Sequence, residues 1–165
     1  MEKIINNLFN IYLFRNSTSL EISKYNNLFL SGRFTINNLI NIIVNSNEYK
    51  IQTRIKLNKL FKELFNREVN NKEYIIFFNY LKQNKNNYRE LLNKLSKNDE
   101  LTLKIKKIYN KYLETDIDDN KLLEYKNKIK NNKIILEDIE HKVLVSDKCC
   151  QLIDYKINNW LRNNK

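Results

Sequence analysis

The sequence predicts an all-α fold: an array of three stacked three-helix repeats of about 50 residues, followed by a C-terminal capping helix. Tyrosine, serine and apolar positions recur along the chain, and Ser46, Ser96 and Ser146 lie fifty residues apart. The chain has no proline and a single glycine, Gly32, whereas sheet-rich domains use more of both in their turns. A repeat of this length is typical of stacked units that are each too small to bury their own apolar face.

The length and composition set the size of the predicted domain. The chain has 165 residues, of which 42% are hydrophobic, and this is enough for one continuous core. We therefore expect a single helical repeat domain over residues 1–165, with units at about 1–45, 46–95 and 96–145. The capping helix is expected at 146–163.

The first unit shows its three helices through apolar spacing and cap residues. Apolar side chains at helical spacing predict a first helix that ends near Phe14. Thr18 and Glu21 form a capping-box pattern that opens a second helix. Gly32 stands where a helix favours a left-handed C-terminal residue, and Thr35 can cap the third helix.

The later units show the same signals. Ser46 is expected to cap the fourth helix with Glu48 in its first turn, and Ser96 with Asp99 to cap the seventh. Ser146 is expected to open the last helix, which would cover the end of the stack with its apolar side chains. The positions that define the repeat are Tyr25, Gly32, Ser46, Phe77, Ser96, Tyr125 and Ser146.

The first unit also resembles a known family at Leu13, Arg15, Tyr25, Ser31, Gly32, Ser46, Glu48 and Tyr49. These residues match the pattern of a bacterial repeat domain of unknown function that is related to the phycobilisome linker domain. Arg67 and Ser96 keep part of the pattern in the second copy, while Thr115 and Lys148 depart from it in the third. The resemblance implies a helical, non-catalytic module that assembles with other proteins, and it brings neither catalytic residues nor pigment binding.

The glycine that precedes the arginine in that family is replaced here by Phe14 in the first copy and Asn66 in the second. Arg15 and Arg67 themselves fall at the end of the first helix of their units. A guanidinium there can bind terminal carbonyls and pair with an acidic residue of the next unit. The alternative is a site for an anion.

A run of carboxylates and amides suggests a second alternative, a calcium loop. Asp116, Asp118 and Asp119 resemble its start, but a calcium loop needs glycine at its sixth position and glutamate at its twelfth. Here these positions hold Lys121 and Asn127. Capping of a helix by Asp118 or Asp119 is therefore the favoured interpretation.

The single histidine and the two cysteines raise the question of zinc. His141, Cys149 and Cys150 do not form the two spaced ligand pairs that a zinc site requires. Adjacent cysteines are also no disulfide framework, which agrees with a reducing compartment. We expect no metal, no cofactor and no catalytic residue.

The net charge of +11 is the strongest functional indication beyond the fold. It predicts a basic surface that binds phosphates or an acidic protein. The other interpretation is that the lysines are solvated and reflect codon bias. The candidate binding residues, with the two arginines above, are Lys82, Lys85, Arg89, Lys104, Lys107 and Lys111.

Two classes of function remain. The first is a structural or adaptor protein that binds a partner with an acidic surface within a larger assembly, for example a virion. The alternative is a nucleic-acid-associated protein, for instance in a ribonucleoprotein particle such as an organellar ribosome. Because no apolar stretch reaches about 18 residues and the first residues do not resemble a signal peptide, we expect a soluble, intracellular chain.

Overall fold

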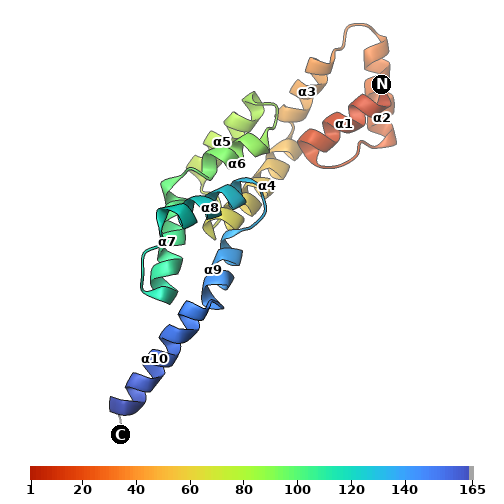
Figure 1. Cartoon of the computed structure of the whole chain (residues 1–165). Helices are drawn as coiled ribbons and strands as arrows, with labels where there is room; N and C mark the ends of the chain where they lie inside the picture. Colours follow the sequence, from red (N-terminus) through yellow and green to blue (C-terminus); the bar gives the residue numbers. More distant parts are fainter. Residues whose placement is uncertain (164–165) are drawn as a thin grey trace. The chain divides into compact units, whose positions relative to one another are not determined.

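The computed structural model describes residues 1–163, which form ten α-helices and no β-strand (Figure 1). The all-α prediction is therefore confirmed. The helices are α1 (Glu2–Leu13), α2 (Ser19–Leu30), α3 (Ile36–Asn45), α4 (Asn47–Phe65), α5 (Asn71–Gln83), α6 (Tyr88–Leu95), α7 (Asp99–Leu113), α8 (Asp119–Lys130), α9 (Leu136–Leu144) and α10 (Asp147–Asn163).

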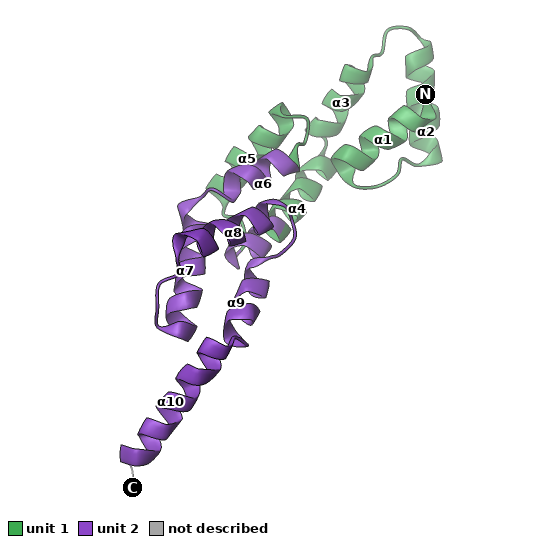
Figure 2. Ribbon diagram, in the orientation of Figure 1, with its two compact units in different colours: residues 1–59, 68–88 green, residues 60–67, 89–165 purple. Residues whose placement is uncertain are grey.

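The helices belong to two compact units, coloured separately in Figure 2. Unit 1 comprises residues 1–59 and 68–88, and unit 2 comprises residues 60–67 together with the chain from Arg89 onward. The division passes through α4, so the first turns of this helix belong to unit 1 and its last turns to unit 2.

In unit 1, α1 lies against α2 and α3. Full burial of a leucine, isoleucine or phenylalanine side chain stabilises a fold by roughly 1.5–3 kcal/mol, before the cost of ordering that side chain. The ring of Phe9 meets that of Tyr25 with centroids 6.0 Å apart, so one of the repeat-defining positions lies in this core. The buried core residues are Ile5, Leu8, Phe9, Tyr12, Leu13, Tyr25, Leu39, Ile43, Val44 and Tyr49.

In unit 2, α7 lies against α9, and α10 contacts both of them. Tyr125 is buried here as its counterpart is in unit 1, and its ring meets that of Tyr109 at 6.4 Å. Buried apolar residues of α7, α8, α9 and α10 include Leu101, Ile105, Ile108, Leu122, Ile129, Leu136, Ile139, Val143 and Cys149.

Several helix ends follow the predicted chemistry. Thr18 Oγ1 accepts a hydrogen bond from the backbone N–H of Glu21 at 3.2 Å, and Thr35 caps α3 in the same way. Ser46 Oγ accepts from the N–H three residues later at 3.0 Å. Gly32 has a φ of +71°, in the left-handed region that glycine adopts with least strain.

The prediction for the start of α7 was wrong by two residues. Its N-cap is Asn98, whose Oδ1 accepts from the N–H of Glu100 at 2.9 Å. Ser96 lies in the turn after α6, where its hydroxyl donates to the carbonyl of Asn93. Both residues are good caps, and a turn between α6 and α7 moves the helix start beyond Ser96, so Asp99 becomes its first residue.

The last helix begins as predicted but does not cover the fold along its length. Ser146 Oγ accepts from the N–H of Cys149 at 3.4 Å, and this thiol side chain is buried. Beyond it, α10 extends past the ends of α7 and α9 (Figure 1), so its later apolar residues are exposed. These are Ile153, Tyr155, Ile157, Trp160 and Leu161.

Candidate functional site

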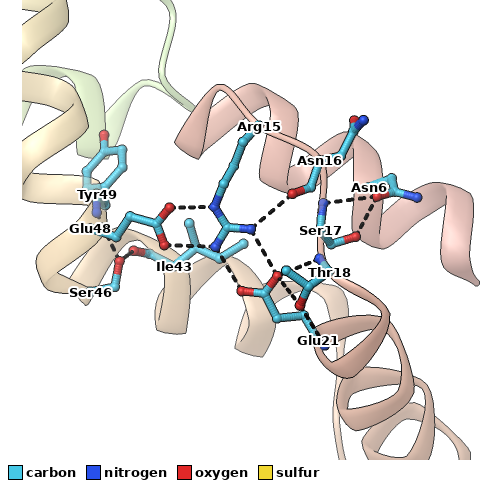
Figure 3. Close-up of polar contacts among 10 residues, drawn as sticks. All are labelled: Asn6, Arg15, Asn16, Ser17, Thr18, Glu21, Ile43, Ser46, Glu48 and Tyr49. Carbon is cyan, nitrogen blue, oxygen red and sulfur yellow. Dashed lines mark hydrogen bonds and ion pairs between the residues drawn. The ribbon is translucent and has the colours of Figure 1, made fainter.

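Arg15 joins two acidic helix starts in unit 1 (Figure 3). Its Nε and Nη2 donate to Glu48 Oε1 and Oε2 at 2.5 and 2.9 Å. Its Nη1 and Nη2 donate to Glu21 Oε2 and Oε1 at 2.9 and 2.8 Å. One guanidinium therefore makes a two-pronged contact with each of two carboxylates, the geometry that arginine offers and lysine lacks.

Both carboxylates are positioned by the caps of their own helices. Glu21 is the third residue of α2, and its Oε2 also accepts from the backbone N–H of Thr18 at 2.7 Å. Glu48 lies in the first turn of α4, directly before Tyr49, whose backbone N–H donates to Ser46 Oγ. Negative charge is stabilised at the beginning of a helix by the unpaired N–H groups there, so these starts suit the two glutamates.

The charges at Arg15 argue against an anion ligand. Two carboxylates face one guanidinium, which leaves a net negative charge at this position. The hydrogen bonds from Arg15 lower the pKa of Glu21 to about 2, and those from Glu48 and Glu21 raise the pKa of Arg15. The guanidinium also lies 5.0 Å from the centre of the Phe9 ring. This arrangement fits a structural contact.

Arg67 makes a contact of the same form in unit 2. Its Nε and Nη2 donate to Glu100 Oε1 and Oε2 at 2.8 and 2.7 Å. Its guanidinium lies 5.0 Å from the ring centre of Phe61. In both contacts the glutamate follows the arginine by 33 residues and lies in the first turn of a helix. The prediction that each arginine pairs with an acidic residue of the next repeat is therefore confirmed, although the sequence analysis did not name Glu48 and Glu100 as the partners.

The residue before each arginine keeps a left-handed backbone without glycine. Phe14 has a φ of +57° and Asn66 one of +49°, and Glu114 has +53° at the corresponding end of α7. A side chain in this region costs on the order of 1 kcal/mol. The ring of Phe14 packs against Tyr88 with centroids 5.8 Å apart, which helps to offset that strain.

The third copy has no such arginine contact. Thr115 stands at the arginine position, and Lys148 is exposed at the start of α10. Glu114 pairs with Lys156 of α10. The end of α7 is therefore joined to α10 by a different ion pair.

Unit 1 also contains a buried polar contact, between Tyr49 and Asn86, that the sequence did not predict. Tyr49 Oη donates to Asn86 Oδ1 at 3.1 Å, and Asn86 Nδ2 donates to the carbonyl of Ile11 at 2.5 Å. The hydroxyl of Thr53 is fully buried beside them. Burial raises the pKa of Tyr49 to about 12, so this phenol stays neutral at physiological pH. The contacts join α4 to the turn before α6 and to α1, which indicates a structural role.

The basic candidates are distributed over both units. Lys82 donates to Asn45 Oδ1 at 2.7 Å in unit 1, where Lys85 is exposed. In unit 2, Lys111 pairs with Glu140 at 3.1 Å. The remaining candidates, Arg89, Lys104 and Lys107, lie in unit 2 with exposed or half-buried side chains.

The residues considered for metals have ordinary surroundings. Asp118 Oδ1 accepts from the N–H of Lys121 at 2.8 Å, so it caps α8 as the favoured interpretation had it. His141 is exposed, Cys149 is a buried free thiol and Cys150 an exposed one. Within residues 1–163, no three His, Cys, Asp or Glu side chains gather in a metal-binding cluster.

Comparison of the chain with protein-family models, with curated proteins and with solved structures yields no match. Over residues 1–163, each helix is too short or too polar to cross a lipid bilayer. The resemblance to the linker-related repeat domain therefore remains a hypothesis.

Proposed function

We propose that this chain is a non-catalytic structural or adaptor protein that binds other proteins within a larger assembly. We also propose that the ten helices form three stacked three-helix repeats near residues 1–45, 46–95 and 96–145, followed by the capping helix. Its action is complementarity of shape and charge, without turnover. Intracellular assemblies, including virions and organellar complexes, are the setting that we propose for it.

Recurring local geometry supports the repeat. The arginine contacts of Arg15 and Arg67 share their donor atoms, their acceptor atoms and their spacing in sequence. The capping boxes at Thr18 and Asn70 each begin the second helix of a proposed 50-residue repeat. Such agreement at separate positions is expected where units of one design follow each other along a chain.

One observation carries the functional proposal: the exposed apolar row along α10. Ile153, Ile157, Trp160 and Leu161 follow each other at helical spacing, so they lie on one side of the helix. Scattered apolar side chains are normal on a surface, but a contiguous row marks an interaction site. Tryptophan in particular is enriched where proteins bind proteins.

The polar residues support the same conclusion. Arg15 and Arg67 are held by glutamates, and Tyr49 and Asn86 bind one another. Their hydrogen bonds serve the packing of helices in their own unit. The resemblance to the linker-related domain points the same way, because it implies a module that assembles with other proteins.

A basic nucleic-acid-associated protein is the second candidate, and the net charge of +11 favours it. Exposed lysines and arginines can bind phosphates in any sequence, and such binding weakens steeply with salt. The same charge suits a protein partner with an acidic surface. Salt dependence alone therefore does not separate the two, whereas nuclease does.

Affinity purification with and without nuclease tests the proposal. We expect a defined protein to remain bound in stoichiometric amount after nuclease treatment. Loss of all bound material after nuclease would favour the second candidate. A clean monomer that retains neither protein nor nucleic acid would contradict both.

A further inference from the structure

The beginning of α10 has the same geometry as the beginning of α4. The hydroxyls of Ser46 and Ser146 each donate to the carbonyl three residues earlier at 2.7 Å. Each also accepts from the N–H three residues later, at 3.0 and 3.4 Å. The residues that supply those N–H groups, Tyr49 and Cys149, are both buried. Positions in α10 therefore correspond to those in α4 one hundred residues earlier.

The later turns of α4 in turn correspond to α1. Asn6 Oδ1 accepts from the N–H of Ser17 at 3.1 Å, and Asn58 Oδ1 accepts from the N–H of Val69 at 3.2 Å. Both hydrogen bonds span 11 residues. Because Asn6 corresponds to Asn58, and Asn58 to Asn158, α10 continues into positions that match those of α1.

The matched positions differ sharply in exposure. Ile5, Leu8 and Phe9 of α1 are 0%, 9% and 2% exposed. Their counterparts in α10, which are Ile157, Trp160 and Leu161, are 52%, 64% and 45% exposed. The hairpin of α2 and α3 covers α1 (Figure 1).

We infer that the later turns of α10 bind an amphipathic helical hairpin of a partner protein, which covers Ile157, Trp160 and Leu161 as α2 and α3 cover α1. This inference rests on the proposed function and names the kind of partner. Asn158 is exposed at the position of Asn6. It is placed to accept a backbone N–H from the segment that leads into the partner's first helix.

The available area favours a hairpin over a second α10. The exposed parts of Ile153, Ile157, Trp160 and Leu161 offer roughly 400 Å² per helix, so two α10 helices would bury roughly 800 Å² through this row. Stable interfaces bury about 1,200 Å² or more in total. A hairpin brings two helices and the loop that leads into them against α10. It can therefore bury the apolar row of α10 to the extent that α2 and α3 bury the side chains of α1.

The chemistry of the hairpin follows from α2 and α3. A residue with a free backbone N–H, and therefore not proline, should precede its first helix, as Ser17 and Val69 do in this chain, so that this N–H reaches Asn158. An aromatic side chain should follow within that helix, because the ring of Tyr25 packs on Phe9, the counterpart of Leu161.

The test uses a synthetic peptide of residues 16–46 as the hairpin, which circular dichroism must show to be helical in the mixture, added to the full chain. Trp160 is the only tryptophan of the chain and is absent from the peptide, so its fluorescence reports this row alone. We expect a saturable shift of the emission to shorter wavelength. Ile157→Glu should weaken binding by about ten-fold or more, because it places a charge in an apolar contact. The matched control is Leu30→Glu in the full chain, at a side chain of α2 that is 85% exposed, and it should leave peptide binding unchanged.

Three results would overturn the inference. They are an unchanged emission at saturating peptide, a shift that Ile157→Glu does not reduce, and a shift that appears on concentrating the chain alone, which would make a second copy the occupant. Circular dichroism must show that Ile157→Glu keeps the helix content. If the peptide fails while a nuclease-resistant protein partner is still captured, the adaptor function stands and another surface carries it.

Discussion

Replacing Arg15 with methionine should destabilise unit 1 by about 2 kcal/mol. The change keeps much of the apolar stem but removes the charge that holds Glu21 and Glu48. Hydrogen bonds to charged groups contribute about 1.5–3 kcal/mol when buried, and exposed ion pairs about 0.2–1 kcal/mol. The three side chains are 33%, 27% and 39% exposed, so the contact lies between these limits. The loss of two carboxylate partners at once places the sum near the upper one.

The assay is urea unfolding followed by circular dichroism, with a double-mutant cycle for one of the two contacts. Arg15→Met, Glu48→Gln and the double variant give a coupling energy that we expect to be about 1 kcal/mol. Arg33→Met is the control, because Arg33 is exposed and close in sequence. It should change the free energy of unfolding by less than about 0.5 kcal/mol.

A cost of Arg15→Met no larger than that of Arg33→Met would contradict this prediction. Simple additivity of Arg15→Met and Glu48→Gln would contradict it as well, since the 2.5 and 2.9 Å contacts would then carry no coupling. Either result would make the arginine contact a surface pair of the kind that contributes nothing measurable.

Three further predictions concern unit 1. Gly32→Ala should lower the free energy of unfolding by about 1 kcal/mol through backbone strain alone, because φ is +71° and a β-carbon would meet open space. Gly32→Asn should cost less. Equal free energies of unfolding in urea for the two variants would contradict this. Tyr49→Phe should cost about 1–2 kcal/mol, because it leaves the buried Asn86 oxygen without its donor; an unchanged midpoint of thermal unfolding would rule out that contribution. The lowered pKa of Glu21 means that its contribution is present above its unfolded pKa of about 4.5 and is lost as pH falls toward about 2. Unfolding measured across this range should show a loss on the order of 1 kcal/mol that Glu21→Gln lacks, and parallel profiles of the two proteins would refute it.

Local signals in the sequence predicted local structure well. Thr18, Thr35 and Ser46 cap helices because a side-chain oxygen reaches the N–H three residues later, and this depends on few other residues. Gly32 adopts the left-handed backbone for a similarly local reason. The error at Ser96 arose because Asn98 is an equally good cap, and the turn after α6 decides between the two.

Contacts between distant residues were harder to foresee. The pairing of Arg15 with Glu48 depends on how α4 returns past the end of α1, which helical periodicity does not reveal. The burial of Asn86 with Tyr49 depends on a similar return. The expectation that α10 covers the fold was wrong for its later turns, because apolar spacing shows that a face can be buried but not that a neighbour is present.

The central claim is that the chain binds a protein through surfaces built from its helices. The most direct test is quantitative affinity purification of the full chain after nuclease treatment, with Ile157→Glu and Leu30→Glu purified in parallel. We expect one defined protein at stoichiometric amount, which the unaltered chain and the Leu30→Glu variant retain and the Ile157→Glu variant loses. Recovery of nucleic acid alone, released by nuclease and by rising salt, would contradict it.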